Sequence, residues 1–104
     1  MDIKTLSEEI EKISFIYTKK FGIERDNNWF VLKLQEELGE LTQSYLMLNG
    51  KARTKGKSEQ ELKDDFAEEV ADVFCHVLLL AKFNNLDLEE EIKDKWLVWN
   101  KKEK

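Results

Sequence analysis

Apolar residues recur every three or four positions along most of the chain, which is the periodicity of amphipathic helices. A polar turn at residues 24–28, in which an asparagine can cap a helix, interrupts the pattern early, and a polar, glycine-containing segment interrupts it again at residues 49–57. Four helices are predicted: residues 3–21, residues 29–48, residues 59–84, and a last helix that follows Asp87 and continues through Trp96 and Trp99 to the charged C-terminus.

Residues at the expected helix ends support these boundaries. Gly22 follows the first pattern, and glycine commonly stands just after a helix C-terminus. Ser58 and Glu61 have the spacing of a capping box, in which each side chain bonds a backbone N–H of the other residue. Asp87 and Glu90 repeat that signature before the last helix. The chain is therefore predicted to alternate long helices with short connections.

The composition fits this prediction. The 104 residues include no proline and four glycines, and 38% are charged, which suits long helices and offers few turn signals for strands. We expect one all-α domain spanning residues 1–104 and resembling a four-helix bundle. The net charge of −5 argues against binding of a nucleic acid polymer. A lone Cys75, no apolar leader and no membrane-spanning run predict a cytoplasmic protein without a membrane partner.

Two eight-residue segments, residues 34–41 (LQEELGEL) and 66–73 (FAEEVADV), are near copies of one another. On helices, their apolar residues form matching stripes, Leu34, Leu38, Leu41 and Tyr45 in one copy and Phe66, Val70, Val73 and Val77 in the other. Gly39 and Ala71 occupy corresponding positions, and we expect the two helices to approach closely there. The copies are therefore predicted to pack against each other.

Each copy also carries two acids three residues apart, which makes them neighbours on a helix surface. Glu37 and Glu40 form the first pair, and Glu69 and Asp72 form the second. If the copies pack together, four carboxylates converge and repel one another unless a cation is present. Oxygen-only ligands without cysteine favour Mg²⁺, or Mn²⁺ as a substitute, over Zn²⁺. These four acids are the predicted metal ligands; on their own they could also form a solvated acidic face.

The third predicted helix is apolar around more than one stripe. Phe74, Leu78 and Leu79 lie away from the stripe that contains Val70. A helix of this kind is either central in its own fold or buried against a partner. For a chain of this size we expect a symmetric assembly, a homodimer or a homotetramer, with a central helix in a monomer as the alternative.

The segments Glu36-Glu-Leu-Gly-Glu40 and Glu69-Val-Ala-Asp72, together with the stretch that follows the second, resemble the EExxE and ExxD motifs of the MazG-like all-α nucleoside triphosphate pyrophosphohydrolases. The resemblance covers roughly residues 29–101. It implies a magnesium-dependent enzyme that hydrolyses a nucleoside triphosphate between its α and β phosphates, giving a monophosphate and pyrophosphate. It further implies catalytic roles for the four acids and for Glu36, which could activate water or support the ligands.

Further residues are candidates for substrate binding. The basic segment with Lys51, Arg53, Lys55 and Lys57 could cover the phosphates, with a solvated connector as the alternative. Lys95 and Asn100 stand where the family has tail residues that could reach phosphate or sugar. Trp29 is a candidate for stacking on a base, or a core residue. His76, four residues after Asp72, could support the ligands or serve a structural role.

Other functions also fit parts of the pattern. The histidine resembles one found in the related phosphoribosyl-ATP pyrophosphohydrolases, so such an enzyme is an alternative. A ferritin-like di-iron site needs Glu-x-x-His pairs, and Val73 stands three residues before His76. A non-catalytic helical module that binds a protein partner stays open, and it predicts that magnesium has no effect on stability or turnover.

Overall fold

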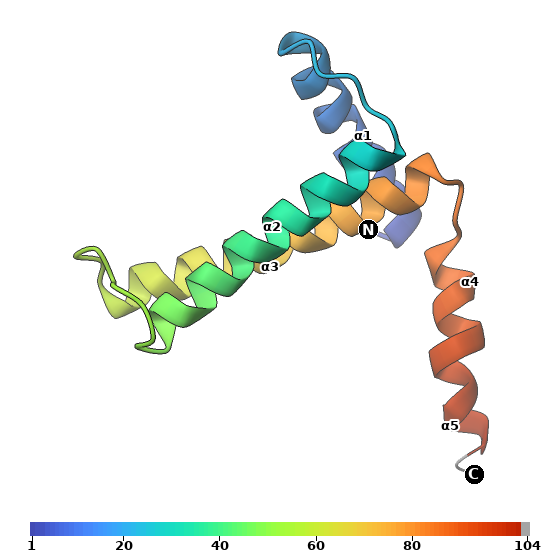
Figure 1. Cartoon of the computed structure of the whole chain (residues 1–104). Helices are drawn as coiled ribbons and strands as arrows, with labels where there is room; N and C mark the ends of the chain where they lie inside the picture. Colours follow the sequence, from blue (N-terminus) through green and yellow to red (C-terminus); the bar gives the residue numbers. More distant parts are fainter. Residues whose placement is uncertain (103–104) are drawn as a thin grey trace.

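The computed structural model describes residues 1–102, and these residues contain helices and no strand. Three long helices are followed by a chain of shorter helical segments (Figure 1). Their bounds are α1 Ile3–Lys20, α2 Asn27–Leu48, α3 Glu59–Phe83, α4 Leu88–Ile92, the π-helix η1 Lys93–Leu97, and α5 Val98–Lys102. The predicted all-α class is confirmed. None of the described helices combines the length and apolar character needed to cross a bilayer.

Side-chain caps fix where the long helices begin. Ser58 Oγ accepts a hydrogen bond from the backbone N–H of Glu61 (3.1 Å), and Glu61 accepts one from the N–H of Ser58 (3.0 Å), which confirms the capping box. Asp87 caps α4 by accepting from the N–H of Glu90. The cap of α2 is Asp26, which accepts from the N–H of Trp29 (2.8 Å). The expected asparagine cap was wrong, because a carboxylate also opposes the positive end of the helix dipole.

Helices α2 and α3 form a long antiparallel hairpin (Figure 1). Phe30 at one end of this hairpin is fully buried, with its ring 4.6 Å from that of Phe83. Leu62 is buried near the other end. The copied motifs lie between these two points on the paired helices. The predicted stripes pack only in part, because Leu38, Tyr45 and Val70 stay 43%, 50% and 45% exposed.

The close approach predicted at Gly39 and Ala71 was wrong. Both residues are exposed, and a Cβ built on Gly39 meets no atom within 4 Å. The positions that face the other helix are those around Glu37 and Leu41, and Gly39 is turned by about 160° from Leu41. The small residues therefore lie on the outer side of the hairpin rather than at its contact line.

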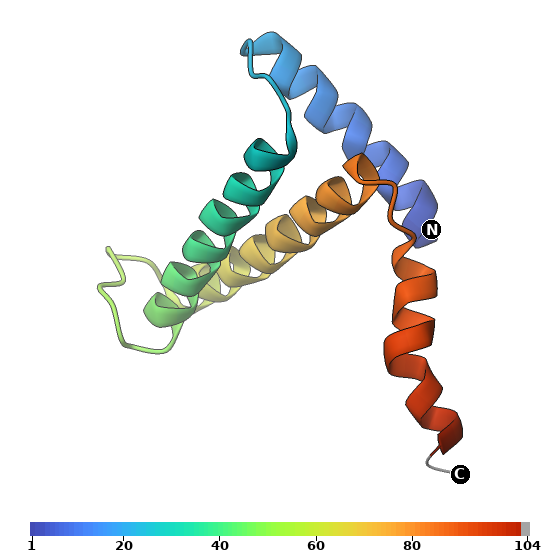
Figure 2. The same ribbon diagram turned by 45° about the vertical axis from the view of Figure 1, so that its right-hand side comes forward.

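Helix α1 crosses the hairpin near the C-terminal end of α3 (Figure 2). Leu78 and Leu79 of α3 are 1% and 5% exposed, so the second apolar stripe of this helix is covered within the chain. Phe74 remains 46% exposed. Of the three residues that the sequence places off the main stripe of α3, Leu78 and Leu79 are therefore buried within the chain, where α1 contacts α3, and Phe74 is not.

The connection between α1 and α2 is tied down by Arg25. Its guanidinium makes a two-point ion pair with Glu11 and donates to Ser14 Oγ (3.3 Å). It also lies over the rings of Phe15 and Phe30, 5.5 Å from each centroid. Bidentate pairs of this kind impose a specific geometry, so Arg25 fixes the angle at which α1 leaves the hairpin.

The C-terminal segments α4, η1 and α5 extend away from the hairpin as an arm (Figures 1 and 2). The radius of gyration is 16.8 Å, whereas a compact domain of this length has about 13 Å. Trp96 on the arm is 68% exposed. The fourth helical element thus does not pack alongside the others in the way that a four-helix bundle within one chain requires.

Candidate metal centre

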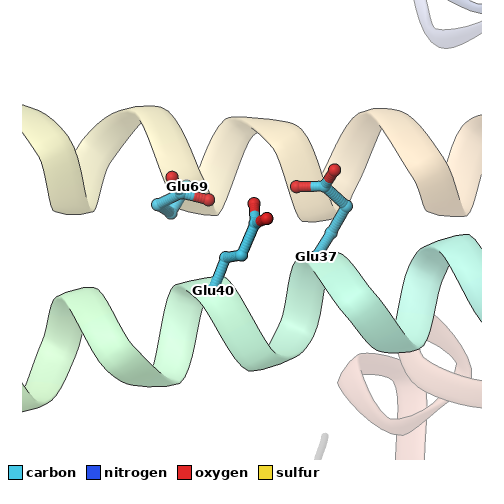
Figure 3. A group of neighbouring side chains, drawn as sticks. All are labelled: Glu37, Glu40 and Glu69. Carbon is cyan, nitrogen blue, oxygen red and sulfur yellow. The ribbon is translucent and has the colours of Figure 1, made fainter.

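Three of the four predicted ligands gather between α2 and α3. Glu37 and Glu40 project from α2, and Glu69 projects from α3, so that their carboxylates point toward one another (Figure 3). One oxygen from each of the three lies within 4.8 Å of the others. Two oxygens that ligate one Mg²⁺ lie at most about 4.2 Å apart, because each Mg²⁺–oxygen distance is about 2.1 Å, so small movements of these side chains would let them share one cation. The two motifs thus bring their first acids, Glu37 and Glu69, together with Glu40.

The cluster is partly withdrawn from solvent, and this gives it an unusual electrostatic character. Glu37 is 8% exposed, and neither its Oε2 atom nor that of Glu69 has a hydrogen-bond partner among the described residues. Burial, followed by the neighbouring Glu40 carboxylate, raises the pKa of Glu37 to about 7. Burial also raises the pKa of Glu69, helped by the charges of Glu40 and Asp72. Buried carboxylate oxygens without partners are costly, and a bound cation would satisfy them.

Two basic side chains lie beside the cluster on the Glu37 side. Lys33 Nζ is 3.3 Å from Glu36 Oε1 and 3.8 Å from Glu37 Oε1. His76 Nε2 is also 3.8 Å from Glu37 Oε1, beyond hydrogen-bonding distance. Burial, followed by the charge of Lys33, lowers the pKa of His76, which favours the neutral ring. Lys33 is therefore the one fixed cation near the acids in the described part of the chain.

Asp72 and Glu36 lie at the edge of this arrangement. Asp72 is exposed and does not belong to the set of three, although its charge acts on both Glu37 and Glu69. Its counterpart in the other motif is Glu40, whose side chain is one methylene longer and reaches inward. Glu36 is exposed and bound to Lys33. The roles of Asp72 as a ligand and Glu36 as a catalytic group stay predictions.

A cleft of about 380 Å³ opens beside Glu37, between α1 and the hairpin. Trp29, Lys33 and Glu37 of α2 line it on one side, and residues of α3 and α1 close it on the others. The α3 and α1 residues are Cys75, His76 and Leu79, with Ile10, Ile13, Ser14 and Tyr17. Trp29 is half-buried there, with its ring edge-on to Phe30. The cleft thus joins an aromatic and apolar wall to the acidic cluster.

The other predicted substrate residues lie elsewhere in the chain. Lys51, Arg53 and Lys55 are exposed in the connection at the free end of the hairpin (Figure 1), where Lys57 pairs with Asp65. This connection starts eight residues beyond Glu40, about 12 Å along the helix. Lys95 and Asn100 are exposed on the arm. One chain therefore brings Trp29 to the acidic cluster but not the basic connection or the arm.

The sequence analysis missed two contributors to this region. Lys33 was not singled out, although its position four residues before Glu37 places both on one helix face. Helix α1 also contributes, because Ser14 and Tyr17 line the cleft. Tyr17 is 51% exposed there. No local sequence signal reveals this, because the crossing angle of α1 depends on the Arg25 contacts.

Comparison of the chain with protein-family models, curated proteins and solved structures finds no significant match. The resemblance to the MazG-like enzymes therefore rests on the motif residues alone.

Proposed function

We propose that this protein is a magnesium-dependent nucleoside triphosphate pyrophosphohydrolase. The observation that carries the proposal is the cluster of Glu37, Glu40 and Glu69, because Glu37 and Glu69 each hold a buried oxygen that finds no hydrogen-bond partner in the described part of the chain. An acidic cluster at a helix–helix contact destabilises the fold when it is not neutralised. A hard divalent cation fits the all-oxygen donor set and leaves coordination positions for water and phosphate. Mn²⁺ fits the same donors.

The reaction breaks the bond between the α phosphorus and the oxygen that bridges to the β phosphate. Water adds to the α phosphorus, the bridging oxygen leaves with pyrophosphate, and the nucleoside monophosphate is released. When bound, the cation would offset charge on the phosphate oxygens and lower the pKa of a coordinated water. Glu37, Glu40 and Glu69 would hold it. A neighbouring carboxylate, with Glu36 as the motif-based candidate, would accept the proton of the attacking water.

The cleft beside Glu37 supports a nucleotide as the substrate. It is large enough for a small heterocycle, and Trp29 supplies an aromatic wall on which a base can stack. Lys33 lies between this wall and the acids, where its ammonium group can bind a phosphate oxygen. The order along the cleft, from aromatic wall to lysine to acidic cluster, follows the order of base, phosphate and cation in a metal-bound nucleotide.

A panel of ribo- and deoxyribonucleoside triphosphates, with phosphoribosyl-ATP included, tests the proposal. Each compound is incubated with the full chain and MgCl₂, and pyrophosphate and orthophosphate are measured separately. We expect pyrophosphate and the monophosphate in equal amounts, and no turnover in EDTA. Turnover of phosphoribosyl-ATP alone would favour the related enzyme class. Orthophosphate as the sole product would contradict the proposed cleavage position, and inactivity throughout would favour a partner-binding module.

We also propose that the chain forms a homo-oligomer, as its uncovered apolar surface suggests.

A further inference from the structure

Lys33 lies one helical turn before Glu37 on α2, beside the acidic cluster. Its Nζ atom donates a hydrogen bond to Glu36 Oε1 (3.3 Å) and lies 3.8 Å from Glu37 Oε1. The second distance is too long for a hydrogen bond, so electrostatic attraction alone holds the ammonium group at Glu37. Such a contact has no fixed geometry, and the ammonium group can leave it when a stronger cation is present.

The pair of Lys33 and Glu37 is less exposed than an ordinary ion pair on a helix surface. Its side chains are 26% and 11% exposed. The pair of Lys63 and Glu59 on α3 has the same four-residue spacing, and its side chains are 57% and 79% exposed. Charges that are partly withdrawn from water are screened less and interact more strongly. Lys33 therefore offsets part of the negative charge of the three converging carboxylates.

The two oxygens of Glu37 have different surroundings. Oε1 lies 3.8 Å from Lys33 Nζ and 3.8 Å from His76 Nε2. Oε2 is buried and has no hydrogen-bond partner in the described part of the chain. The same carboxylate is thus a neighbour of Lys33 and a member of the acidic cluster (Figure 3). A cation held by Glu37 and the ammonium group of Lys33 would be two positive charges at one carboxylate, and they would repel each other.

Lys33 also lines the cleft of about 380 Å³ between α1 and the hairpin. Trp29, one turn earlier on α2, lines the same cleft. The ammonium group is therefore at the boundary between the acids and the space in which we place the nucleotide. A lysine carries its charge on a flexible four-carbon stem, so the ammonium group can turn from Glu37 to a ligand in the cleft without movement of the helix.

We infer that Lys33 is an internal counter-ion of Glu37, which the divalent cation replaces and which then becomes available to a phosphate of the substrate; this inference rests on the proposed function. In the metal-free chain, Lys33 neutralises part of the acidic cluster. Once Glu37 ligates a cation, the ammonium group loses its attraction to this carboxylate and can bind a phosphate oxygen in the cleft. Metal binding and phosphate binding are thereby coupled, and the coupling is reciprocal.

This exchange gives Lys33 opposite effects on the two ligands. Its positive charge competes with the metal ion and attracts the phosphate. Removal of the charge should therefore strengthen binding of the metal and weaken binding of the phosphate. A lysine that only stabilised the shape of the site would, when replaced, weaken the binding of both.

Calorimetric titration of the full chain with MgCl₂, in the absence of nucleotide, measures the competition without any enzymatic activity. Lys33→Met is expected to bind Mg²⁺ at least about fivefold more tightly than the wild-type chain, because the competing charge is gone. Lys33→Arg keeps the charge and should stay within about threefold of the wild-type Kd. Lys63→Met is the matched control, since it removes a lysine from an exposed pair of the same spacing, and it should also stay within about threefold.

A second titration measures the release of Lys33 to phosphate. Methylenediphosphonate, a stable analogue of pyrophosphate, is mixed with MgCl₂ and added to each chain at a saturating Mg²⁺ concentration. Lys33→Met is expected to bind the analogue about three- to tenfold more weakly than the wild-type chain, and Lys63→Met about equally. Far-UV circular dichroism establishes that each variant keeps its helical content.

The outcomes separate this inference from the proposed function. If the wild-type chain binds Mg²⁺ and folded Lys33→Met binds it equally or more weakly, the counter-ion exchange is wrong and the metal centre stands. Equal tightening in Lys63→Met, or tightening in His76→Gln instead of Lys33→Met, would also overturn the exchange. Unchanged binding of the analogue in Lys33→Met would contradict the release to phosphate. A wild-type chain that binds no Mg²⁺ would contradict the metal centre itself, and this inference with it.

Discussion

The two copies of the acidic motif, on α2 and on α3, are alike in sequence and differ in their surroundings. Glu37 has Lys33 and His76 beside it, whereas the charges that act on Glu69 are all acidic. The second acid of the α2 copy, Glu40, reaches the cluster, and that of the α3 copy, Asp72, stays at its edge. The repeated pattern thus gives the acids equivalent positions on the two helices, while side-chain length and neighbouring charges decide whether each acid reaches the cluster and in what surroundings.

This difference suggests that the two copies have different roles. The α2 copy, next to Lys33 and the cleft, lies where the substrate would enter. In the proposed function, the α3 copy would supply Glu69 as a ligand from the other side. Variants that alter one copy at a time can therefore separate cation binding from substrate binding, and the predictions below are ordered by the size of the expected effect.

Removing the inward-reaching acid should have the largest effect. Glu40→Ala is expected to lower the rate of pyrophosphate release at least about 100-fold, because one of three converging ligands is lost. Glu68→Ala is the control, since Glu68 is an exposed acid directly beside Glu69. Its rate should stay within about threefold of wild type. Equal losses of rate in Glu40→Ala and Glu68→Ala would show that the activity depends on overall negative charge rather than on the acidic cluster.

The raised pKa of Glu37 predicts how stability depends on pH. Because the folded-state pKa is about 7, above the unfolded value, the stabilising contribution of the protonated group is fully present below about pH 4.5 and is lost as pH rises through 7. The metal-free chain should lose about 1–3 kcal/mol of unfolding free energy between pH 5 and pH 8 from this group. Urea titrations at both pH values measure it.

Glu37→Gln is the control for this pH dependence. The variant should lose much less stability over the same range, since the amide does not titrate. Saturating Mg²⁺ should also offset the loss in the wild-type chain, because the cation binds the ionised carboxylates. An equal change in stability from pH 5 to pH 8 in the wild-type chain and in Glu37→Gln would contradict the raised pKa of Glu37.

Exchanging the second acids of the two motifs tests whether side-chain reach explains their difference. Glu40→Asp is expected to weaken Mg²⁺ binding about 10-fold, and Asp72→Glu to strengthen it, because the longer side chain can join the cluster. Calorimetric titration with MgCl₂ measures both. If the two variants weaken binding equally, the positions are equivalent ligands and the asymmetry described above is wrong.

The smallest effect is expected at Lys33, which lies beside the first motif alone. Lys33→Met should raise the KM for the best nucleotide about three- to tenfold, with a smaller change in kcat, because the lysine binds a phosphate in the ground state as well. Lys63→Met is the control, since Lys63 pairs with Glu59 on an exposed surface. Comparable changes in KM would show that Lys33 acts through overall charge.

The sequence was sufficient to predict features that depend on local chemistry. The long helices, the Ser58 capping box and the pairing of the two motifs all follow from spacing within one or two turns. The sequence predicted that four acids at the same edge of two matching stripes would converge. Three of them, Glu37, Glu40 and Glu69, do so, and Asp72 does not belong to the group.

Features that depend on contacts distant in sequence were not predictable. The position of α1 is set by Arg25 contacts to a residue 14 positions away, so its part in lining the cleft left no local pattern. The failure at Gly39 has another origin. A small residue lies at a helix contact only if its position around the helix axis faces the other helix. Gly39 faces outward, and the acids lie on the side of α2 that faces α3.

The binding of a cation by Glu37, Glu40 and Glu69 is most directly tested by thermal unfolding with increasing MgCl₂. A ligand at 100 times its Kd stabilises the fold by about 2.7 kcal/mol, which corresponds to a rise in Tm of roughly 10 °C for a chain of this length. We predict a rise of this size in the wild-type chain, growing with the logarithm of the MgCl₂ concentration once it exceeds the Kd, and no rise in Glu69→Gln. A Tm independent of Mg²⁺ and Mn²⁺, or an equal rise in both chains, would contradict the proposed centre.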